Sequence, residues 1–82
     1  MTNLIQNETH TIKPMYRFFD SLYNTLEDIG QDNITEWSHK EEPKQVYAIV
    51  TNEEAVYSVL DAGDACYIAK TMEEATSELE EY

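Results

Sequence analysis

The sequence predicts an α+β domain in which a three-stranded antiparallel meander is flanked by an N-terminal amphipathic helix and a short acidic C-terminal helix. Three observations lead to this fold class. Apolar residues recur at helical spacing between residues 14 and 29. Three short apolar runs rich in Val, Ile and Tyr follow between residues 45 and 71, separated by polar breaks. An acidic stretch that opens with a helix-capping pattern then occupies residues 72–82.

Length and composition indicate a single domain that spans residues 1–82. A chain of this size buries one small core. With 41% hydrophobic residues, the composition is that of a folded protein despite a formal net charge of −12. The one cysteine, Cys66, excludes an internal disulfide and fits a reducing compartment. Because it lies in an apolar run, we expect its thiol to be buried.

The longest predicted helix covers residues 14–29. Pro14 favours the first helical position, and Gly30 stands where a helix C-cap belongs. The apolar residues then fall on one face of the helix: Met15, Phe18, Phe19, Leu22, Leu26 and Ile29. Glu27 and Asp28 fall at its C-terminal end, where the helix dipole disfavours acids, which suggests a role other than stability.

Two flanking segments show no strong helical or strand pattern. Residues 1–11 are expected to form a polar lead-in arm, either a frayed turn of helix or a loose segment. Residues 31–44 are expected to form a loop or an edge strand, with Ile34–Ser38 as the candidate strand. Trp37 is the only tryptophan, and it fits either a lid over the core or an exposed contact residue.

The predicted meander occupies residues 45–71. Its strands are the runs Val46–Thr51, Ala55–Leu60 and Ala65–Lys70, each of which carries a tyrosine. The polar breaks at residues 52–54 and 61–64 are short enough for hairpins. Gly63 is expected to supply the positive φ that a tight turn needs.

Both faces of the first predicted strand are apolar. Val46, Ala48 and Val50 point to one side, and Tyr47 and Ile49 point to the other. Such a strand needs cover on both faces, and two short helices cover one face well. We therefore expect a second copy of the chain to close the other face, which predicts a homodimer.

A short acidic helix is predicted for residues 72–82. Thr71 supplies a hydroxyl at the N-cap, and Glu74 stands three residues later, as in a capping box. A thin apolar stripe of Met72, Ala75 and Leu79 is expected to dock the helix on the sheet.

No catalytic, metal-binding or cofactor motif stands out in the sequence. His10 and His39 stand apart, without a second histidine or a cysteine cluster at metal spacing. Asp61 and Asp64 flank Gly63, but the alternating acids of a calcium loop are missing. They are interpreted as turn residues. We therefore expect no enzyme activity, no metal and no cofactor.

Charge is the strongest functional signal. Residues 1–44 carry eight acids and four bases, whereas residues 45–82 carry nine acids and only Lys70 as a base. A basic surface that binds phosphates responds to negative charge whatever group carries it, while nucleic acid itself is repelled. The predicted partner-binding residues are the nine acids of the C-terminal half: Glu53, Glu54, Asp61, Asp64, Glu73, Glu74, Glu78, Glu80 and Glu81.

Within the predicted C-terminal helix, Glu74, Glu78 and Glu81 form a row at i, i+4 and i+7, and Glu73 and Glu80 form a parallel row. Four acids of the first predicted helix and its end are the alternative site: Asp20, Glu27, Asp28 and Asp32.

In size, acidity and α/β character the chain resembles the small acidic DNA-mimic inhibitors of bacteriophages, although no sequence motif is shared. That group includes uracil-DNA glycosylase inhibitor, several anti-CRISPR proteins, and phage proteins that block RNA polymerase or nucleoid proteins. The resemblance implies an inhibitor that occupies the DNA-binding surface of a host nucleoid, polymerase, repair or defence protein.

Two other functions fit the same composition. One is an immunity or antitoxin protein that neutralises a basic nuclease or toxin, since its interface would be equally acidic. The other is an acidic accessory domain whose charge serves solubility. The sequence shows no secretory signal and no apolar run of membrane length, so we expect a cytoplasmic protein, in a bacterial host if a phage encodes it.

Overall fold

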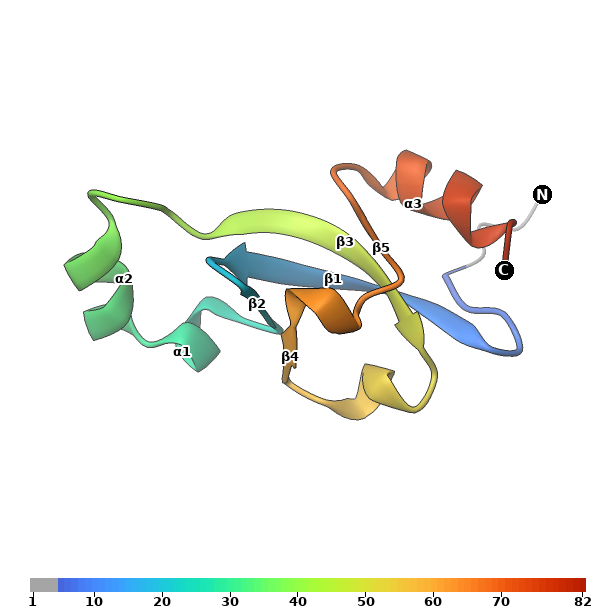
Figure 1. The fold of residues 1–82 in the computed structure, drawn as a ribbon, viewed down its shortest axis with the longest axis horizontal. Helices are drawn as coiled ribbons and strands as arrows, with labels where there is room; N and C mark the ends of the chain where they lie inside the picture. The colour runs from blue at the N-terminus through green and yellow to red at the C-terminus, as the bar shows by residue number, and fades with distance from the viewer. Residues whose placement is uncertain (1–4) are drawn as a thin grey trace.

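A five-stranded antiparallel sheet forms the body of the protein in the computed structural model, which describes residues 5–82 (Figure 1). From one edge to the other, its strands are β4 (Val59–Asp61), β2 (Ser21–Tyr23), β1 (His10–Phe18), β3 (Lys44–Thr51) and β5 (Tyr67–Ala69). The helices are α1 (Leu26–Ile29), α2 (Gln31–Trp37) and α3 (Met72–Leu79), with 3₁₀ turns η1 (Glu54–Val56) and η2 (Ala62–Asp64). The predicted α+β class is confirmed, but the arrangement differs from the prediction.

The predicted helix over residues 14–29 is wrong, because this segment forms most of β1, then β2 and α1. Met15 and Phe18 of the predicted stripe are both buried in β1, three residues apart, and so they point to opposite faces of the sheet. A strand covered on both faces can bury side chains at such intervals, which imitates helical spacing. Pro14 is tolerated because β2 pairs only from Tyr16 onward, so β1 has one paired neighbour at this point.

The predicted lead-in arm over residues 1–11 is partly replaced by structure, since β1 begins at His10. Asn7 closes a turn before it, because its side-chain oxygen accepts from the backbone N–H groups of Thr9 (2.8 Å) and His10 (2.7 Å). Residues 1–4 of the arm lie outside the described residues.

Two short helices replace the predicted helix end and the predicted loop or edge strand of residues 31–44. Gly30 is the C-cap of α1, as expected of a glycine there, with its N–H donating to the carbonyl of Leu26 (3.2 Å). The next helix, α2, begins directly after Gly30. None of its residues is buried, so its sequence lacks the apolar stripe from which a helix is predicted. The proposed strand Ile34–Ser38 is therefore wrong.

Glu27 and Asp28 also lie in a different setting from the one predicted. They occupy the first turn of α1, where acids are favourable to the helix dipole. Thr25 caps this helix, because its hydroxyl accepts from the Asp28 N–H (3.2 Å) and Asp28 Oδ2 accepts from the Thr25 N–H (3.2 Å). These acids thus stabilise the helix start.

The predicted meander of residues 45–71 is also wrong, although its three runs overlap β3, β4 and β5 in turn. β1 pairs with one edge of β3 and β5 pairs with the other, so β4 pairs instead with β2 at the far edge of the sheet. The breaks at 52–54 and 61–64 therefore connect strands that are not neighbours. Gly63 lies in η2 without a positive φ, contrary to prediction.

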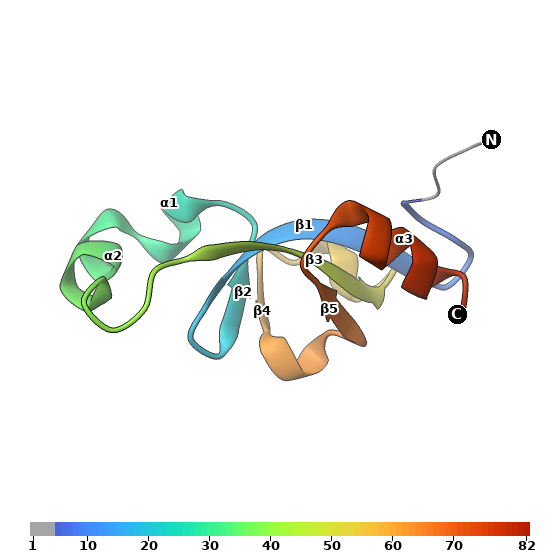
Figure 2. The same ribbon diagram turned by 90° about the horizontal axis from the view of Figure 1, so that it is seen from above.

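Both faces of β3 are buried, as the sequence predicts. On one face a core forms from Ile12, Ile49, Ala69, Ala75 and Leu79, with α3 as its cover. On the other face a second core forms from Met15, Leu22, Val46, Ala48, Val50 and Leu60. Ala55 of η1 and Ala65 beyond η2 pack on this second core. In Figure 2, β4 and β5 descend on the same side of the β1–β3 pair, and η2 joins their lower ends.

The chain thus closes both faces of its sheet by itself, which removes the reason for expecting a second copy. The homodimer stays a prediction that the fold does not require.

The predicted C-terminal helix is confirmed as α3, but it ends at Leu79 rather than at residue 82. Thr71 is its N-cap and accepts from the Glu74 N–H (3.1 Å). Ala75 and Leu79 are buried, with 0% and 2% of their surface exposed. Full burial of a leucine stabilises a fold by about 1.5–3 kcal/mol, so this stripe fixes α3 firmly on the sheet.

The molecule is elongated, with principal extents of 42 × 22 × 19 Å. α1 and α2 form a lobe at one end of the long axis, and α3 and the C-terminus lie at the other end (Figures 1 and 2). None of the helices within residues 5–82 has the length and apolar character needed to cross a membrane.

The two glycines provide a test of this fold. Gly30 has a φ of 96°, and an added Cβ would meet only Asn33 Nδ2 at 3.6 Å, so any cost of Gly30→Ala comes from the backbone. We expect Gly30→Ala to lower the free energy of unfolding by about 1 kcal/mol or more, measured by urea denaturation.

Gly63→Ala is the matched control, because Gly63 has no positive φ and nothing lies within 4 Å of its added Cβ. It should be neutral or stabilise the protein by up to about 1 kcal/mol, since alanine restricts the unfolded chain. Equal losses in both variants would contradict the described turns.

Candidate functional site

The sheet separates the nine predicted partner-binding acids into two sets. Glu53, Glu54, Asp61 and Asp64 lie at or beside η1 and η2, on the side of the second core. Glu73, Glu74, Glu78, Glu80 and Glu81 lie on α3 or the turn after it, on the opposite face. The structure therefore brings five of the nine together and keeps the four turn acids apart from them.

On α3, the acids differ in exposure. Glu73 and Glu80 are exposed and line a shallow groove of about 430 Å³ with Met72, Thr76 and Ser77. The predicted row of Glu74, Glu78 and Glu81 is only partly helical, because Glu81 lies beyond the end of α3. The exposed carboxylates of this end are therefore Glu73, Glu80 and Glu81.

Glu74 has a structural role. Its Oε2 accepts from the hydroxyl of Tyr67 in β5 (2.5 Å), and its Oε1 accepts from the Lys70 N–H (3.4 Å). The hydrogen bond to Glu74, together with burial and the nearby charges of Glu74, Glu78 and Tyr82, raises the pKa of Tyr67 to about 12. Glu74 thus ties α3 to β5 and is half-buried, which makes it a poor contact for a partner.

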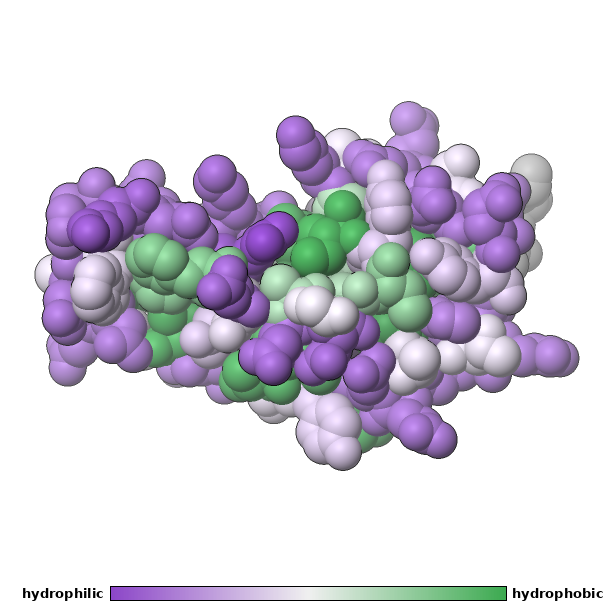
Figure 3. Space-filling model, in the orientation of Figure 1, coloured by the Kyte–Doolittle hydropathy of each residue, from purple (hydrophilic) through white to green (hydrophobic). Residues whose placement is uncertain are grey.

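Glu54 is likewise occupied within the fold. Its Oε1 accepts from the hydroxyl of Thr51 (3.0 Å), and its N–H donates to the same hydroxyl (3.3 Å). The other turn acids, Glu53, Asp61 and Asp64, are exposed. In Figure 3 hydrophilic side chains cover both ends of the face in view, and apolar side chains gather between them.

The few bases are concentrated in one place. Arg17, Lys44 and Lys70, three of the five basic residues, line a groove of about 750 Å³ with Glu41 and other residues. Lys13 is engaged elsewhere, because its Nζ donates to the Tyr57 carbonyl (2.5 Å), and burial lowers its pKa. This distribution leaves the α1–α2 lobe and the exposed side of α3 acidic.

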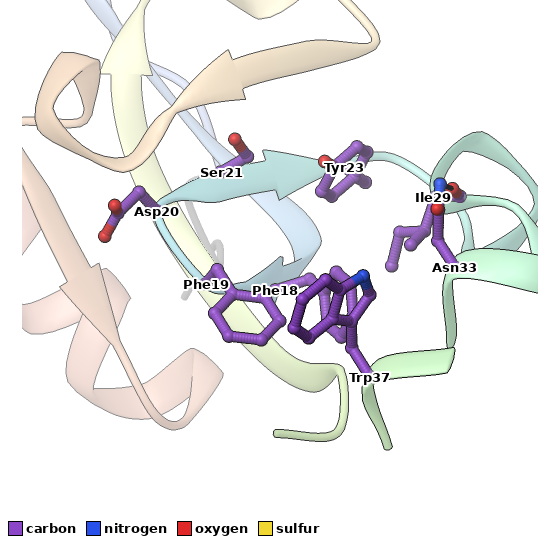
Figure 4. Close-up of a pocket in the computed structure, with 8 residues that line it drawn as sticks. All are labelled: Phe18, Phe19, Asp20, Ser21, Tyr23, Ile29, Asn33 and Trp37. Carbon is purple, nitrogen blue, oxygen red and sulfur yellow. Dashed lines mark hydrogen bonds between the residues drawn. The ribbon is translucent and has the colours of Figure 1, made fainter. Parts of the chain in front are cut away.

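A pocket of about 410 Å³ opens between the β1–β2 hairpin and the α1–α2 lobe (Figure 4). It is lined by Phe18, Phe19, Asp20, Ser21, Tyr23, Ile29, Asn33 and Trp37. The Phe19 ring lies edge-on to Phe18 (4.8 Å between centroids) and to Trp37 (6.0 Å). Trp37 lies between the two predicted alternatives of a buried lid and an exposed contact residue, since 39% of its surface is exposed. His39 stacks on it from outside the pocket, at 6.3 Å.

Phe19 adopts a left-handed backbone conformation, with a φ of 56°. It stands at the tip of the β1–β2 hairpin, where Phe18 pairs with Ser21. A bulky residue in this conformation is strained. Its N–H donates to Glu41 Oε2 (2.6 Å), and its carbonyl accepts from Arg17 Nε (3.3 Å), so both backbone polar groups of Phe19 are held.

Sequence reasoning missed this pocket, because it placed Phe18 and Phe19 on the stripe of a helix. The polar pair Asp20-Ser21 between two apolar runs is the signal for a hairpin that could have exposed it.

The remaining chemically active side chains do not converge on a site. Cys66 is exposed, so the predicted burial of its thiol is wrong; it lies in the connection before β5, where its N–H pairs with the Ile49 carbonyl (2.8 Å). His10 packs against Tyr82 at the C-terminus (4.7 Å between centroids). Within residues 5–82, no group of three or more His, Cys, Asp and Glu side chains is placed to hold a metal ion.

No protein-family model, curated protein or solved structure matches the chain.

The Tyr67–Glu74 contact makes a prediction about pH. Because the folded pKa of Tyr67 is raised from 10 to about 12, the contact stabilises the fold fully below pH 10 and is lost as the pH rises through about 12. We expect the difference in ultraviolet titration between the wild type and Tyr67→Phe to show a phenol that ionises near pH 12.

In Glu74→Gln the same difference curve should shift to lower pH, because the carboxylate that holds the phenol proton is gone. Glu73→Gln is the control, since Glu73 contributes nothing to the Tyr67 shift. A Tyr67 titration that is unaffected by Glu74→Gln would show that the contact does not form in solution.

Proposed function

We propose that this protein is an acidic DNA mimic that binds the basic nucleic-acid-binding surface of a partner protein and excludes nucleic acid from it. The observation that carries the proposal is the set of exposed carboxylates at the α3 end: Glu73, Glu80 and Glu81. Glu73 stands on α3, whose inner face is buried against the sheet, and Glu80 and Glu81 follow in the turn that ends this helix, so all three are presented from one anchored end of the fold.

The positions of these charges support the proposal. Glu73 and Glu80 are seven residues apart, about two helical turns, so they lie on the same side of α3. Both are exposed and line the same shallow groove, although Glu80 already lies at the C-cap. Two carboxylates on one side of the helix can therefore contact a basic surface together.

Net charge supplies the rest of the attraction. At −12 the protein repels nucleic acid and attracts a basic surface over several ångströms. Binding would neutralise lysines and arginines that otherwise contact phosphates, and it would weaken as salt screens the charges. The resemblance to phage inhibitors in size and acidity favours the same function.

A pull-down from bacterial lysate tests the proposal, with this protein as bait at low and at high salt. We expect it to capture a basic nucleic-acid-binding protein that high salt or duplex DNA releases. Capture of a nuclease or toxin whose activity it neutralises without DNA competition would instead indicate an immunity protein. The proposed mimicry would be overturned if duplex DNA failed to release the captured protein from the bait. It would also be overturned if the bait captured no protein.

Charge reversal locates the surface. The triple variant Glu73→Lys, Glu80→Lys and Glu81→Lys should weaken binding of the captured protein roughly tenfold or more, since it places cations against a basic groove. The matched control is Glu53→Lys, Asp61→Lys and Asp64→Lys, which changes the net charge equally with exposed acids on the other face.

The control should retain most of the binding. If both triples lose it equally, total charge rather than the α3 surface is responsible. If only the control loses it, the partner binds at η1 and η2.

A further inference from the structure

The aromatic pocket beside the β1–β2 hairpin lies at the opposite end of the molecule from α3 (Figure 1). Figure 4 shows the rings of Phe18, Phe19 and Trp37 side by side, with Tyr23 above them on β2. Phe18 is buried, and it forms the back of the cluster. Phe19 and Trp37 are each 39% exposed, so two aromatic rings remain open to a ligand.

The rim of the pocket offers hydrogen-bond acceptors and no cation. Ser21 and Tyr23 contribute hydroxyl groups from β2. The side-chain nitrogen of Asn33 donates to the Ile29 carbonyl (2.9 Å), which leaves the oxygen of the same amide to accept. The Asp20 carboxylate lines the pocket but points away from the rings (Figure 4). A ligand that suits this rim therefore carries several donors.

The surrounding charge is mostly negative. Residues 18–39, which include every lining residue, contain five acids and no lysine or arginine. Bases adjoin the pocket on one side only, where the Arg17 Nε donates to the Phe19 carbonyl (3.3 Å) and the groove of Arg17, Lys44 and Lys70 shares Phe19 and Asp20 with it. All five acids are exposed: Asp20, Glu27, Asp28, Asp32 and Glu36. Cations are attracted to aromatic faces, and a field of this sign adds to that attraction.

The pocket is also preorganised. The strained conformation of Phe19 presents its ring beside Trp37, and hydrogen bonds to its backbone N–H and carbonyl hold it there. Strain of this kind persists at binding sites, where surrounding contacts over-determine the backbone. Little ordering is then left for a ligand to impose.

We propose that this pocket binds the guanidinium group of an arginine side chain from a partner protein. A guanidinium is planar, stacks on aromatic rings and directs five N–H donors at its edge, which matches open rings surrounded by acceptors. An ammonium group lacks the planar stacking surface, and an apolar side chain gains nothing from the acidic lobe. The proposal goes beyond DNA mimicry, because the pocket is distant from the α3 acids and arginine binding can be measured without any nucleic-acid-binding protein.

Trp37 reports directly on the pocket, since it is the only tryptophan. We expect N-acetyl-arginine amide to change its fluorescence saturably, and the corresponding leucine and glutamate derivatives to give no saturable change at the same ionic strength. A saturable response to leucine that equals the response to arginine would identify an apolar dock instead. The absence of saturation with arginine would also overturn the proposal.

Phe19→Gly tests the ring without disturbing the backbone, because glycine adopts a φ of 56° freely. It should weaken arginine binding roughly tenfold, while the tryptophan reporter remains. Tyr57→Ala is the matched control, since Tyr57 is an exposed aromatic residue (57%) outside the pocket, and its affinity should equal that of the wild type.

Trp37→Ala, followed by calorimetry, gives a second and independent variant. Trp37 is partly exposed, so its loss should leave the fold intact by circular dichroism while arginine binding falls. Unchanged arginine affinity in both Phe19→Gly and Trp37→Ala would show that arginine binds elsewhere.

Discussion

The antiparallel pairing of β1 with β3 is the contact on which the rest of this fold depends. Eight residue pairs join the two strands, from His10–Thr51 to Arg17–Lys44. Both strands contribute to both cores: Ile12 and Ile49 face α3, while Met15 and Val46 face the opposite side. β2 and β5 pair with these two strands, α3 packs on them, and β4 and α1 attach through β2. In a chain of 82 residues with little apolar surface to spare, such double use of two strands supplies two small cores instead of one.

The parts of the fold that could be predicted are those that local sequence determines. The N-cap at Thr71, the apolar stripe of α3 and the C-cap at Gly30 each depend on only a few neighbouring residues. β1 could not be predicted from its pattern, because a strand covered on both faces need not alternate, and Met15 and Phe18 then imitate a helix. The pairing partners of β4 and β5 could not be predicted either. β1 pairs with one edge of β3, so β5 pairs with the other edge and β4 pairs with β2, and no local sequence pattern indicates this order.

The candidate sites divide in the same way. The acids of α3 could be predicted, since charge and helical position are visible in the sequence. Which of them are available could not, because the role of Glu74 depends on Tyr67, seven residues away on another element. The aromatic pocket was even harder to predict from the sequence. Phe19 occupies a turn position where glycine or asparagine is expected, and it is held there by Glu41, which is 22 residues distant.

Strong negative charge and local structure contribute different things to recognition. A charge of −12 acts over a distance and raises the rate at which a basic partner arrives, but any basic surface feels it. Selectivity requires groups that are held in place and desolvated on contact, and aromatic anchors are the commonest of these. Phe19 has the properties of such an anchor. Its left-handed backbone costs on the order of 1–3 kcal/mol, and hydrogen bonds to Glu41 and Arg17 hold it in that conformation. The ring is therefore fixed in place before any partner arrives, and the 39% of its surface that is exposed is free for contact.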